Sequence, residues 1–271
     1  MVTHDQFYTN GEVAERLYEK TKELINIEDY DIILEPSAGT GSFYKLFPHN
    51  KRVGLDLEPK YEGIIQQDFL TFEPDLLKTY ISIGNPPFGR VSSIAIKFFN
   101  KCAEFSDYVC FIIPRTFNKV SVQNKLNLNF HLVYSEDLPD KPCCFNPNMS
   151  AKCCYQIWKR SDVPRQIILY DKEHTDFSFI PYGPKDDKNQ PTPPLGSDFA
   201  LRAYGGKCGE IILQNLNILR PKSWHFIKSN IDTNELILRL QALDFSSSRN
   251  TVRQNSLGKQ ELIYLYKEKY G

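Results

Sequence analysis

Six consecutive residues, Gly84-Asn85-Pro86-Pro87-Phe88-Gly89, combine hydrogen-bond acceptors with a flat aromatic ring. The two prolines follow an apolar segment, restrict the backbone and remove two amide donors. The side-chain oxygen of Asn85 and the carbonyl oxygen of Pro86 are then held as acceptors beside the ring of Phe88. Such a set suits a planar amine, which is held by its hydrogens and stacked on the ring. Taken in isolation, the motif also fits an ordinary proline turn.

A glycine-rich turn, Glu35-Pro36-Ser37-Ala38-Gly39-Thr40-Gly41-Ser42-Phe43, directly follows the apolar residues 32–34. Glycines let the backbone turn sharply and approach a ligand closely. A helix expected over 43–47 would add free N–H groups at its start. The turn lacks the lysine of a phosphate-binding loop and the full dinucleotide fingerprint, which disfavours a nucleoside triphosphatase.

Two acidic residues follow the next two apolar segments. Asp56 comes after 52–55, where a carboxylate can accept hydrogen bonds from ribose hydroxyls. Asp68 comes after 63–65 and can accept from the amine of an adenine, with Phe69 against the ring. Each acid alone fits a helix or turn cap equally well. Together at one edge of a sheet they favour a bound ligand, because open α/β sheets bind ligands there.

These motifs lie between short apolar segments that alternate with helical patterns. Strands are expected at 32–34, 52–55, 63–65, 80–83 and 108–113, followed by an antiparallel pair at 130–137 and 151–159. Helices are expected at 12–26, capped by Thr9 and Asn10, and at 43–47 and 92–104. The pattern predicts an α/β fold, with a mostly parallel sheet, an antiparallel last strand and helices on both faces.

The composition changes near residue 160. The region 161–197 becomes rich in proline and reads as a connector, so the first domain is expected to cover 1–160. A hairpin is expected from 199–204 and 210–213, and helices at 232–243 and 257–269. The segment 198–271 therefore predicts a small C-terminal α+β region.

The charge balance differs along the chain. The whole chain holds 33 basic and 33 acidic residues, but residues 1–90 hold 9 and 15, whereas residues 202–271 hold 11 and 6. A basic tail that also contains aromatic residues suits nucleic acid, with Arg202 and Lys222 as candidate contacts. The alternative is a solvated surface over a small aromatic core.

Composition also bears on location and metals. The seven cysteines are odd in number and no secretory signal precedes them, so a reduced cytoplasmic setting is expected, or a nuclear or viral-factory setting in a eukaryotic or viral source. The pairs Cys143-Cys144 and Cys153-Cys154 are interpreted as buried hairpin residues rather than a zinc site, and no metal is expected. No apolar run is long enough to span a membrane.

The segments EPSAGTGSF, DLEP, QDFL and NPPF, in this order, resemble the S-adenosylmethionine-dependent amino-methyltransferases. They are most similar to the N6-adenine DNA methyltransferases of restriction–modification type that carry a C-terminal target-recognition domain, where a segment like Phe7-Tyr8-Thr9-Asn10 precedes the glycine turn. The resemblance covers roughly residues 4–160. Phe88 stands where the family usually has tyrosine, which removes a hydroxyl but keeps the stacking face.

The resemblance implies a class I, Rossmann-like methyltransferase fold, S-adenosylmethionine as cofactor and methyl transfer to adenine N6 in DNA. It implies that the reaction is carried by Asn85, Pro86, Pro87 and Phe88. It places at the cofactor Tyr8, Thr9, Glu35, Pro36, Ser37, Ala38, Gly39, Gly41, Asp56, Leu57, Asp68, Phe69 and Asn85. It places Phe88 at the substrate. A second stacking ring is needed on the other face of the base, and Phe145, in the loop between 130–137 and 151–159, is the candidate for it, beside the tail candidates Arg202 and Lys222.

Other readings stay open at this point. NPPF also occurs in adenine methyltransferases that act on ribosomal or messenger RNA, and a related motif occurs in glutamine methyltransferases. DNA is favoured over RNA because many small RNA enzymes of this type lack an appended region like 198–271. A non-catalytic nucleic-acid-binding subunit with the same fold is a further alternative. The resemblance also allows a restriction endonuclease partner, and a monomer or weak dimer.

Overall fold

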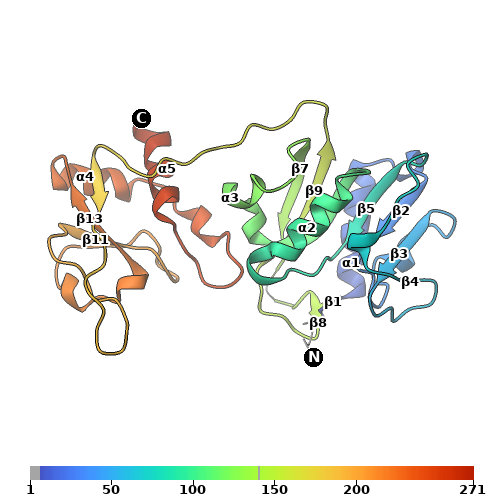
Figure 1. The fold of residues 1–271 in the computed structure, drawn as a ribbon, viewed down its shortest axis with the longest axis horizontal. Helices are drawn as coiled ribbons and strands as arrows, with labels where there is room; N and C mark the ends of the chain where they lie inside the picture. The colour runs from blue at the N-terminus through green and yellow to red at the C-terminus, as the bar shows by residue number, and fades with distance from the viewer. Residues whose placement is uncertain (1–6, 140) are drawn as a thin grey trace. The chain divides into compact units, whose positions relative to one another are not determined.

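The computed structural model describes residues 7–139 and 141–271, which form two compact units, Met1–Ile167 and Ile168–Gly271 (Figure 1). The division falls inside the region that we expected to be a connector, 161–197. Part of that region, β10 (Phe177–Phe179), is built into the sheet of the second unit.

The first unit contains a seven-stranded sheet in the order β4-β3-β2-β5-β6-β9-β7. Strands β4, β3, β2, β5 and β6 are parallel, and β9 is antiparallel to both of its neighbours. In the order of the sheet, the strands cover Ile65–Gln66, Arg52–Asp56, Ile32–Glu35, Tyr80–Gly84, Ser106–Pro114, Cys153–Arg160 and Phe130–Asp137. The mostly parallel sheet with an antiparallel last strand is thus confirmed.

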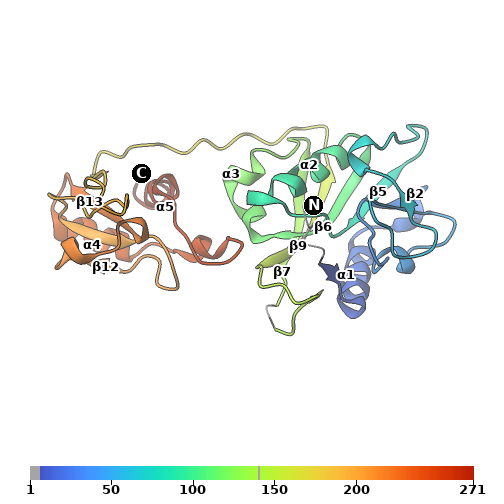
Figure 2. The same ribbon diagram turned by 60° about the horizontal axis from the view of Figure 1, so that its bottom comes forward.

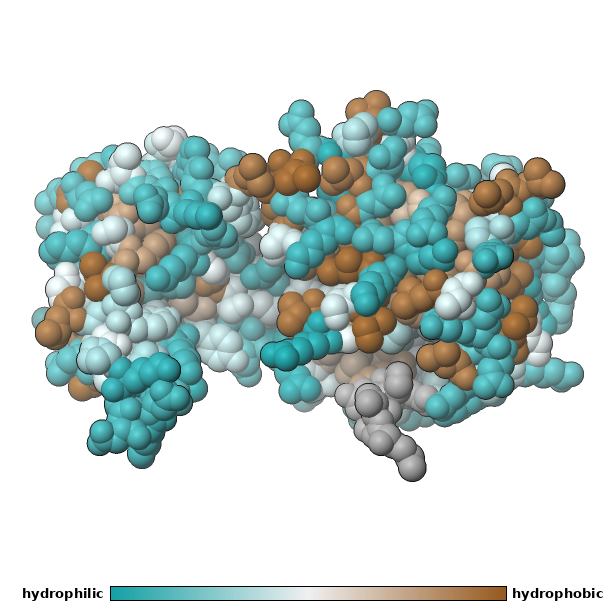
Figure 3. All heavy atoms as spheres, in the orientation of Figure 1, coloured by the Kyte–Doolittle hydropathy of each residue, from teal (hydrophilic) through white to brown (hydrophobic). Residues whose placement is uncertain are grey.

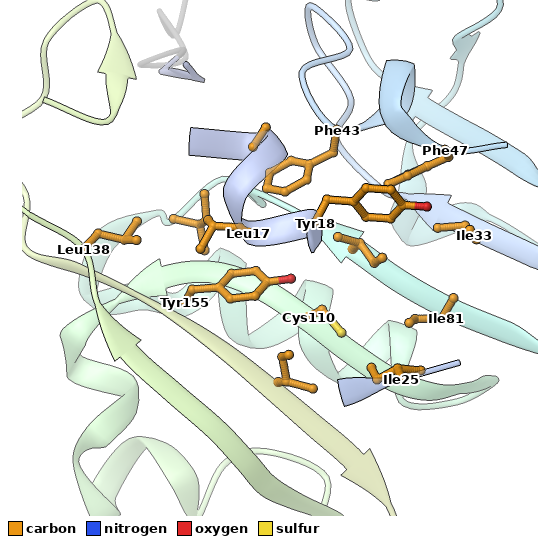
Figure 4. Packing of buried hydrophobic residues seen from close by; sticks show 14 of the residues in the cluster. Leu17, Tyr18, Ile25, Ile33, Phe43, Phe47, Ile81, Cys110, Leu138 and Tyr155 are labelled. Carbon is orange, nitrogen blue, oxygen red and sulfur yellow. The ribbon is translucent and has the colours of Figure 1, made fainter. Parts of the chain in front are cut away.

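Helices cover both faces of this sheet, because successive strand residues point in opposite directions. Ile33 packs with Tyr18 of α1 (Gly11–Leu24), as Figure 4 shows. Its neighbour Leu34 lies in the cluster on the other face, with residues of α2 (Ser93–Cys102). Figure 2 shows α1 and α2 on opposite sides of the sheet.

The expected helix over 43–47 is wrong, because only one 3-10 turn, Tyr44–Leu46, forms there. Pro48 disfavours the helical conformation for the residue before it, and Phe47 is accordingly extended, with φ −76° and ψ 147°. The glycine-rich turn is therefore not followed by a helix that presents free N–H groups. The remaining short helical elements of this unit are Ile27–Asp29, Phe69–Thr71, Arg90–Ser92, Arg115–Asn118 and α3 (Val120–Gln123).

A separate two-stranded sheet joins the N-terminal segment to a distant loop. Strand β1 (Tyr8–Thr9) pairs antiparallel with β8 (Phe145–Asn146), and Thr9 lies opposite Phe145. Asn10 extends this link, because its side-chain nitrogen donates to the Cys143 carbonyl at 2.8 Å. Asn10 is the N-cap residue of α1 as expected, but its side chain makes no capping hydrogen bond.

The second unit is a small α+β region built on a four-stranded antiparallel sheet, in the order β10-β13-β11-β12. Strands β11 (Phe199–Arg202) and β12 (Ile211–Ile212) confirm the expected hairpin. The other elements are β13 (Trp224–Ser229), α4 (Thr233–Gln241), α5 (Lys259–Tyr270) and the 3-10 turns Leu216–Ile218, Pro221–Ser223 and Ser246–Arg249.

Both helices of this unit pack on one face of its sheet, where Leu236 of α4 and Leu262 of α5 meet Ile227 of β13. On the face drawn in Figure 3, the unit presents mainly hydrophilic side chains. Over residues 7–139 and 141–271, no helix is both long enough and apolar enough to cross a membrane.

Candidate active site

The glycine turn after β2 is tied to the end of β3 by Asp56. Gly39 and Gly41 have left-handed φ values of 48° and 75°, which glycine adopts at low cost. The Gly39 amide donates to Asp56 Oδ2 at 2.7 Å, and the Glu58 amide donates to Asp56 Oδ1 at 2.8 Å. Each carboxylate oxygen keeps a second lone pair, so Asp56 can hold the turn and still accept from a ligand.

Tyr8 lies against this turn. A Cβ atom added to Gly39 would lie 2.7 Å from Cε1 of the Tyr8 ring, so no larger residue fits without moving the ring. The Lys60 ammonium lies 5.0 Å from the centre of the same ring, and the Lys60 amide donates to the Gly39 carbonyl at 2.9 Å. Tyr8 thereby forms one wall of the turn.

A small pocket opens between the glycine turn, β1 and the end of β5. It is lined by Phe7, Tyr8, Thr9, Glu35, Ser37, Ala38, Thr40, Ser42 and Asn85. The Asn85 side-chain nitrogen donates to the Phe7 carbonyl at 3.2 Å, and Ser37 Oγ donates to the Asn85 carbonyl at 3.0 Å. These bonds fix the Asn85 side chain at the carboxyl end of the sheet.

Two polar atoms of this pocket are buried without a hydrogen-bond partner among the residues that the structure describes. They are Asn85 Oδ1 and Thr9 Oγ1. A buried polar atom left unpaired costs roughly 1–3 kcal/mol, so such atoms are rare in folded proteins. Both atoms are therefore available to a ligand that enters this pocket.

The rest of the proline motif is anchored to α2. The Phe88 carbonyl accepts from the Ile94 amide at 3.2 Å and from the Ala95 amide at 3.3 Å. Pro86 is buried, Pro87 is exposed, and Phe88 is half-buried at the edge of the core on the α1 side. The motif is therefore a fixed turn that leaves part of the Phe88 ring accessible.

Glu35 is a buried carboxyl group in the wall of the pocket. Its Oε2 accepts from the Tyr44 amide at 2.7 Å, and only 3% of the Glu35 surface is exposed. Burial raises the Glu35 pKa well above its ordinary value, and the charge of Asp56 raises it further, whereas the Tyr44 bond opposes this. The neutral form is therefore the one that the fold favours.

We expect Glu35→Gln to stabilise the first unit increasingly as the pH rises. The raised pKa means that the protonated carboxyl contributes stability below about pH 4.5, its unfolded value, and loses it as the pH rises. Glutamine keeps the acceptor for Tyr44 but never ionises. Calorimetry from pH 5 to pH 9 should show the melting temperature of Glu35→Gln rising relative to the wild type, and a constant difference would contradict the assignment.

The other acid of the sheet edge, Asp68, is exposed, and its Oδ1 accepts from the Leu70 amide at 2.9 Å, as a cap of the Phe69–Thr71 turn. Phe69 is 1% exposed, and its ring packs on Phe98 at 5.0 Å in the core. We therefore leave Phe69 out of the proposed site. Leu57, next to Asp56, is 53% exposed at the same edge.

Phe145 does not offer a free ring face. It is 3% exposed and belongs to the core cluster on the α1 side. Its role in the structure is to pair β8 with β1, which places Thr9 at the pocket. The structure does not support Phe145 as the second stacking ring, because both ring faces are taken up by packing.

Three consecutive ring-bearing residues of β13 lie in the core of the C-terminal region. Trp224, His225 and Phe226 are each at most 7% exposed, so the aromatic-core alternative holds for them. Arg202 lies over the Trp224 ring and pairs with Glu210 at 3.0 Å. Lys222 is exposed and donates to the Gln190 side chain at 3.0 Å.

His225 makes the second unit sensitive to acid. Its Nε2 lies 2.8 Å from the Leu257 carbonyl, and burial lowers its pKa to about 4 from 6.5. The neutral ring therefore contributes stability above about pH 6.5 that is lost as the pH falls towards 4, on the order of 3 kcal/mol. We expect the unfolding free energy to fall over this range.

The control for this prediction is His225→Gln, which does not titrate and should show a flatter pH profile. Asp176 and Asp198 have pKa values below the ordinary 3.8, through hydrogen bonds from Tyr266 and Lys228, so their contributions are lost only at lower pH. Equal pH profiles for the variant and the wild type would exclude His225 as the cause.

The cysteines contribute packing. All seven are free thiols, and Cys154 of β9 lies 3.7 Å from the Ile113 carbonyl in the buried sheet. Among the described residues, no group of three or more His, Cys, Asp or Glu is arranged to hold a metal ion.

Three lining residues were not foreseen, namely Phe7, Thr40 and Ser42. Ser42 Oγ donates to the Thr9 carbonyl at 2.6 Å and so joins the glycine turn to β1. Thr40 and Ser42 could have been predicted as lining residues, because they are polar residues inside the glycine turn. Nothing in the local sequence indicates that this turn contacts β1.

No known protein family matches the sequence, and no curated protein matches it. Among solved structures, the chain is similar to the proposed RNA methyltransferase of Pyrococcus horikoshii, with 18% identity and a TM-score of 0.44, over 58% of this chain and 88% of that one. It is also similar to the 23S rRNA methyltransferase ErmE, with 17% identity and a TM-score of 0.41, over 59% and 71%.

A third similar structure is the magnesium protoporphyrin IX methyltransferase of Synechocystis PCC 6803, with 11% identity and a TM-score of 0.37, over 56% of this chain and 80% of that one. Similarities at this level give no information on the reaction or the substrate. The strand order of the first unit, with five parallel strands followed by the antiparallel β9 inserted beside β6, is the stronger observation. The first unit has the class I methyltransferase fold.

Proposed function

We propose that the first unit transfers a methyl group from S-adenosylmethionine to the N6 amine of adenine in nucleic acid, and that DNA is the preferred substrate. The observation that carries this proposal is the buried Oδ1 atom of Asn85, in a proline-fixed turn at the carboxyl end of β5, which has no hydrogen-bond partner within residues 7–139 and 141–271. It provides an acceptor for an N–H group, which is the group that an amine substrate brings.

The residues of the pocket fit the cofactor. Thr9 Oγ1, which is buried without a partner in the part of the chain that the structure describes, and the Ser37 side chain suit its methionine end. The left-handed turn at Gly39 and Gly41 allows close approach. The carboxylate of Asp56 suits its ribose hydroxyls. When bound, S-adenosylmethionine supplies an electrophilic methyl group.

The chain's own contribution to the reaction is to hold and polarise the amine. Adenine N6 is a weak nucleophile because its lone pair is shared with the ring. When Asn85 Oδ1 and the Pro86 carbonyl accept its two hydrogens, the nitrogen shifts towards a tetrahedral shape and its lone pair becomes available. The same two acceptors stabilise the positive charge that develops on the nitrogen, and the surplus proton leaves to water. Phe88 stacks on the base and fixes its orientation.

The proposal is tested by incubating the full chain with methyl-labelled S-adenosylmethionine and duplex DNA, single-stranded DNA or RNA. We expect label in DNA. Label in RNA alone would favour the RNA alternative, and label in a protein would favour a glutamine methyltransferase. Binding of S-adenosylmethionine without transfer to any nucleic acid would contradict the proposed activity and favour a non-catalytic subunit.

A further inference from the structure

We propose that Arg90 and Val91, in the turn after the proline motif, contact the nucleic-acid strand that carries the target adenine. Arg90 binds a phosphate beside this adenine, and Val91 packs on the adjoining base. This inference rests on the proposed function, because it takes the ligand of this turn to be a nucleic-acid strand. It adds two residues of the first unit to the proposed substrate contacts, in addition to those of the basic tail.

The backbone of this turn is held in an unfavourable conformation. Val91 has φ 53° and ψ 38°, and Ser92 has φ 60°. Left-handed values are uncommon for residues other than glycine, and for a β-branched residue such as valine they are outliers, of a kind that clusters at active sites and ligand-binding segments. Val91 is also 74% exposed, so packing of its side chain in the fold does not explain why the conformation is kept.

Fixed contacts on both sides of the turn impose this conformation. Before it, Gly89 has φ 66°, and a Cβ atom there would lie 2.5 Å from Ile94 Cγ1. After it, Ser92 is 1% exposed, and its hydroxyl lies 2.7 Å from that of Thr116. The tip between them, Arg90 and Val91, is therefore a rigid projection directly beside Phe88.

The charge of Arg90 points to an anionic ligand. Arg90 is exposed, and within 7–139 and 141–271 it forms no ion pair at 4.0 Å or less. A guanidinium group matches the geometry of a phosphate, which it can bind through two parallel hydrogen bonds.

An arginine and an exposed apolar residue side by side match the two parts of a nucleotide. A phosphate lies next to every base of a strand, and an apolar side chain can occupy the face of a base whose neighbour has left the stack. An acidic protein segment could also pair with Arg90, but it does not repeat a charge and a flat apolar face at every residue, as a nucleic-acid strand does at every nucleotide.

The charge contact is tested with Arg90→Ala. The matched control is Lys97→Ala, which removes another exposed positive charge, on α2. Binding of a fluorescent adenine-containing DNA duplex is measured by anisotropy over a range of salt concentrations, with S-adenosylmethionine present. We expect Arg90→Ala to weaken binding about tenfold and to reduce the slope of log Kd against log salt by about 0.9, the value for one phosphate contact. Lys97→Ala should match the wild type.

The apolar contact is tested with Val91→Asn, because asparagine adopts the left-handed conformation more readily and keeps a similar size. We expect its melting temperature to equal or exceed that of the wild type, while the KM for DNA rises severalfold and kcat stays within about twofold. A lower melting temperature with an unchanged KM would assign Val91 a purely structural role and overturn this part of the inference.

The outcomes separate this inference from the proposed function. If the wild type methylates DNA or RNA but Arg90→Ala and Val91→Asn behave like Lys97→Ala, the inference about this turn fails and the proposed function stands. If the wild type methylates no nucleic acid, or methylates a protein instead, both fail together.

Discussion

Asn85→Ala is expected to lower kcat for methyl transfer by about 10²- to 10³-fold and to leave binding of S-adenosylmethionine measurable. The variant removes Oδ1, the buried acceptor that has no partner among the described residues, and with it one of the two groups that polarise the amine. It also removes the donor to the Phe7 carbonyl, which should cost only about 0.5–1.5 kcal/mol of stability. Initial rates with saturating DNA and cofactor give kcat, and calorimetry gives cofactor binding.

Asn50→Ala is the matched control, since Asn50 is an exposed asparagine in a surface turn before β3. It should retain the wild-type kcat. An Asn85→Ala protein that is folded and fully active would remove Asn85 from the reaction, and the proposed mechanism with it.

Asp56→Ala is expected to raise the Kd for S-adenosylmethionine by about 10- to 100-fold and to destabilise the first unit. Two backbone amides, those of Gly39 and Glu58, donate to this carboxylate, and hydrogen bonds to charged groups contribute roughly 1.5–3 kcal/mol each. Without the carboxylate, the glycine turn loses its link to β3 and the ribose loses its acceptor. Calorimetric titration gives the Kd, and thermal unfolding gives the stability.

Two further variants sharpen this result. Asp56→Asn keeps one acceptor oxygen and should lie between the wild type and Asp56→Ala in both measurements. Asp75→Ala is the matched control, because the Asp75 carboxylate also accepts from the amide two residues later, that of Leu77, away from the pocket. An Asp56→Ala protein that binds the cofactor as tightly as Asp75→Ala does would place the ribose elsewhere.

The sheet and its edge were predictable from the sequence because their signals are local. Short apolar segments mark the parallel strands. Asp56, at the end of β3, and Asp68, shortly after β4, must therefore lie at the carboxyl ends of those strands. Asn85 follows β5 for the same reason. Successive residues of a buried strand point to opposite faces of the sheet, so each face carries apolar side chains that a helix must cover.

The contacts that complete the pocket were not predictable, because they join distant residues. Thr9 reaches its place through pairing with Phe145, 136 positions away, and two-residue strands carry no periodic pattern that would reveal their register. Phe145 was misplaced for the same reason. Its position in a loop suggested exposure, whereas the pairing with β1 buries it in the core.

The sequence left two interpretations of the aromatic residues in the tail, because composition does not show which faces of a sheet are covered. Trp224 and Phe226 of β13 point to one face, and His225 and Ile227 point to the other. Both faces are covered, one by α4 and α5 and the other by residues such as Leu216 and Leu219, so all four side chains are buried.

The central claim is tested most directly by identifying the methylated product. DNA incubated with the full chain and S-adenosylmethionine is digested to nucleosides and analysed by mass spectrometry against standards. We predict N6-methyl-2′-deoxyadenosine in the wild-type reaction, and about 10²- to 10³-fold slower formation with Asn85→Ala. Methylation of cytosine instead of adenine, or a complete absence of methylated nucleosides from a protein that binds the cofactor, would contradict the assignment of this site to adenine N6.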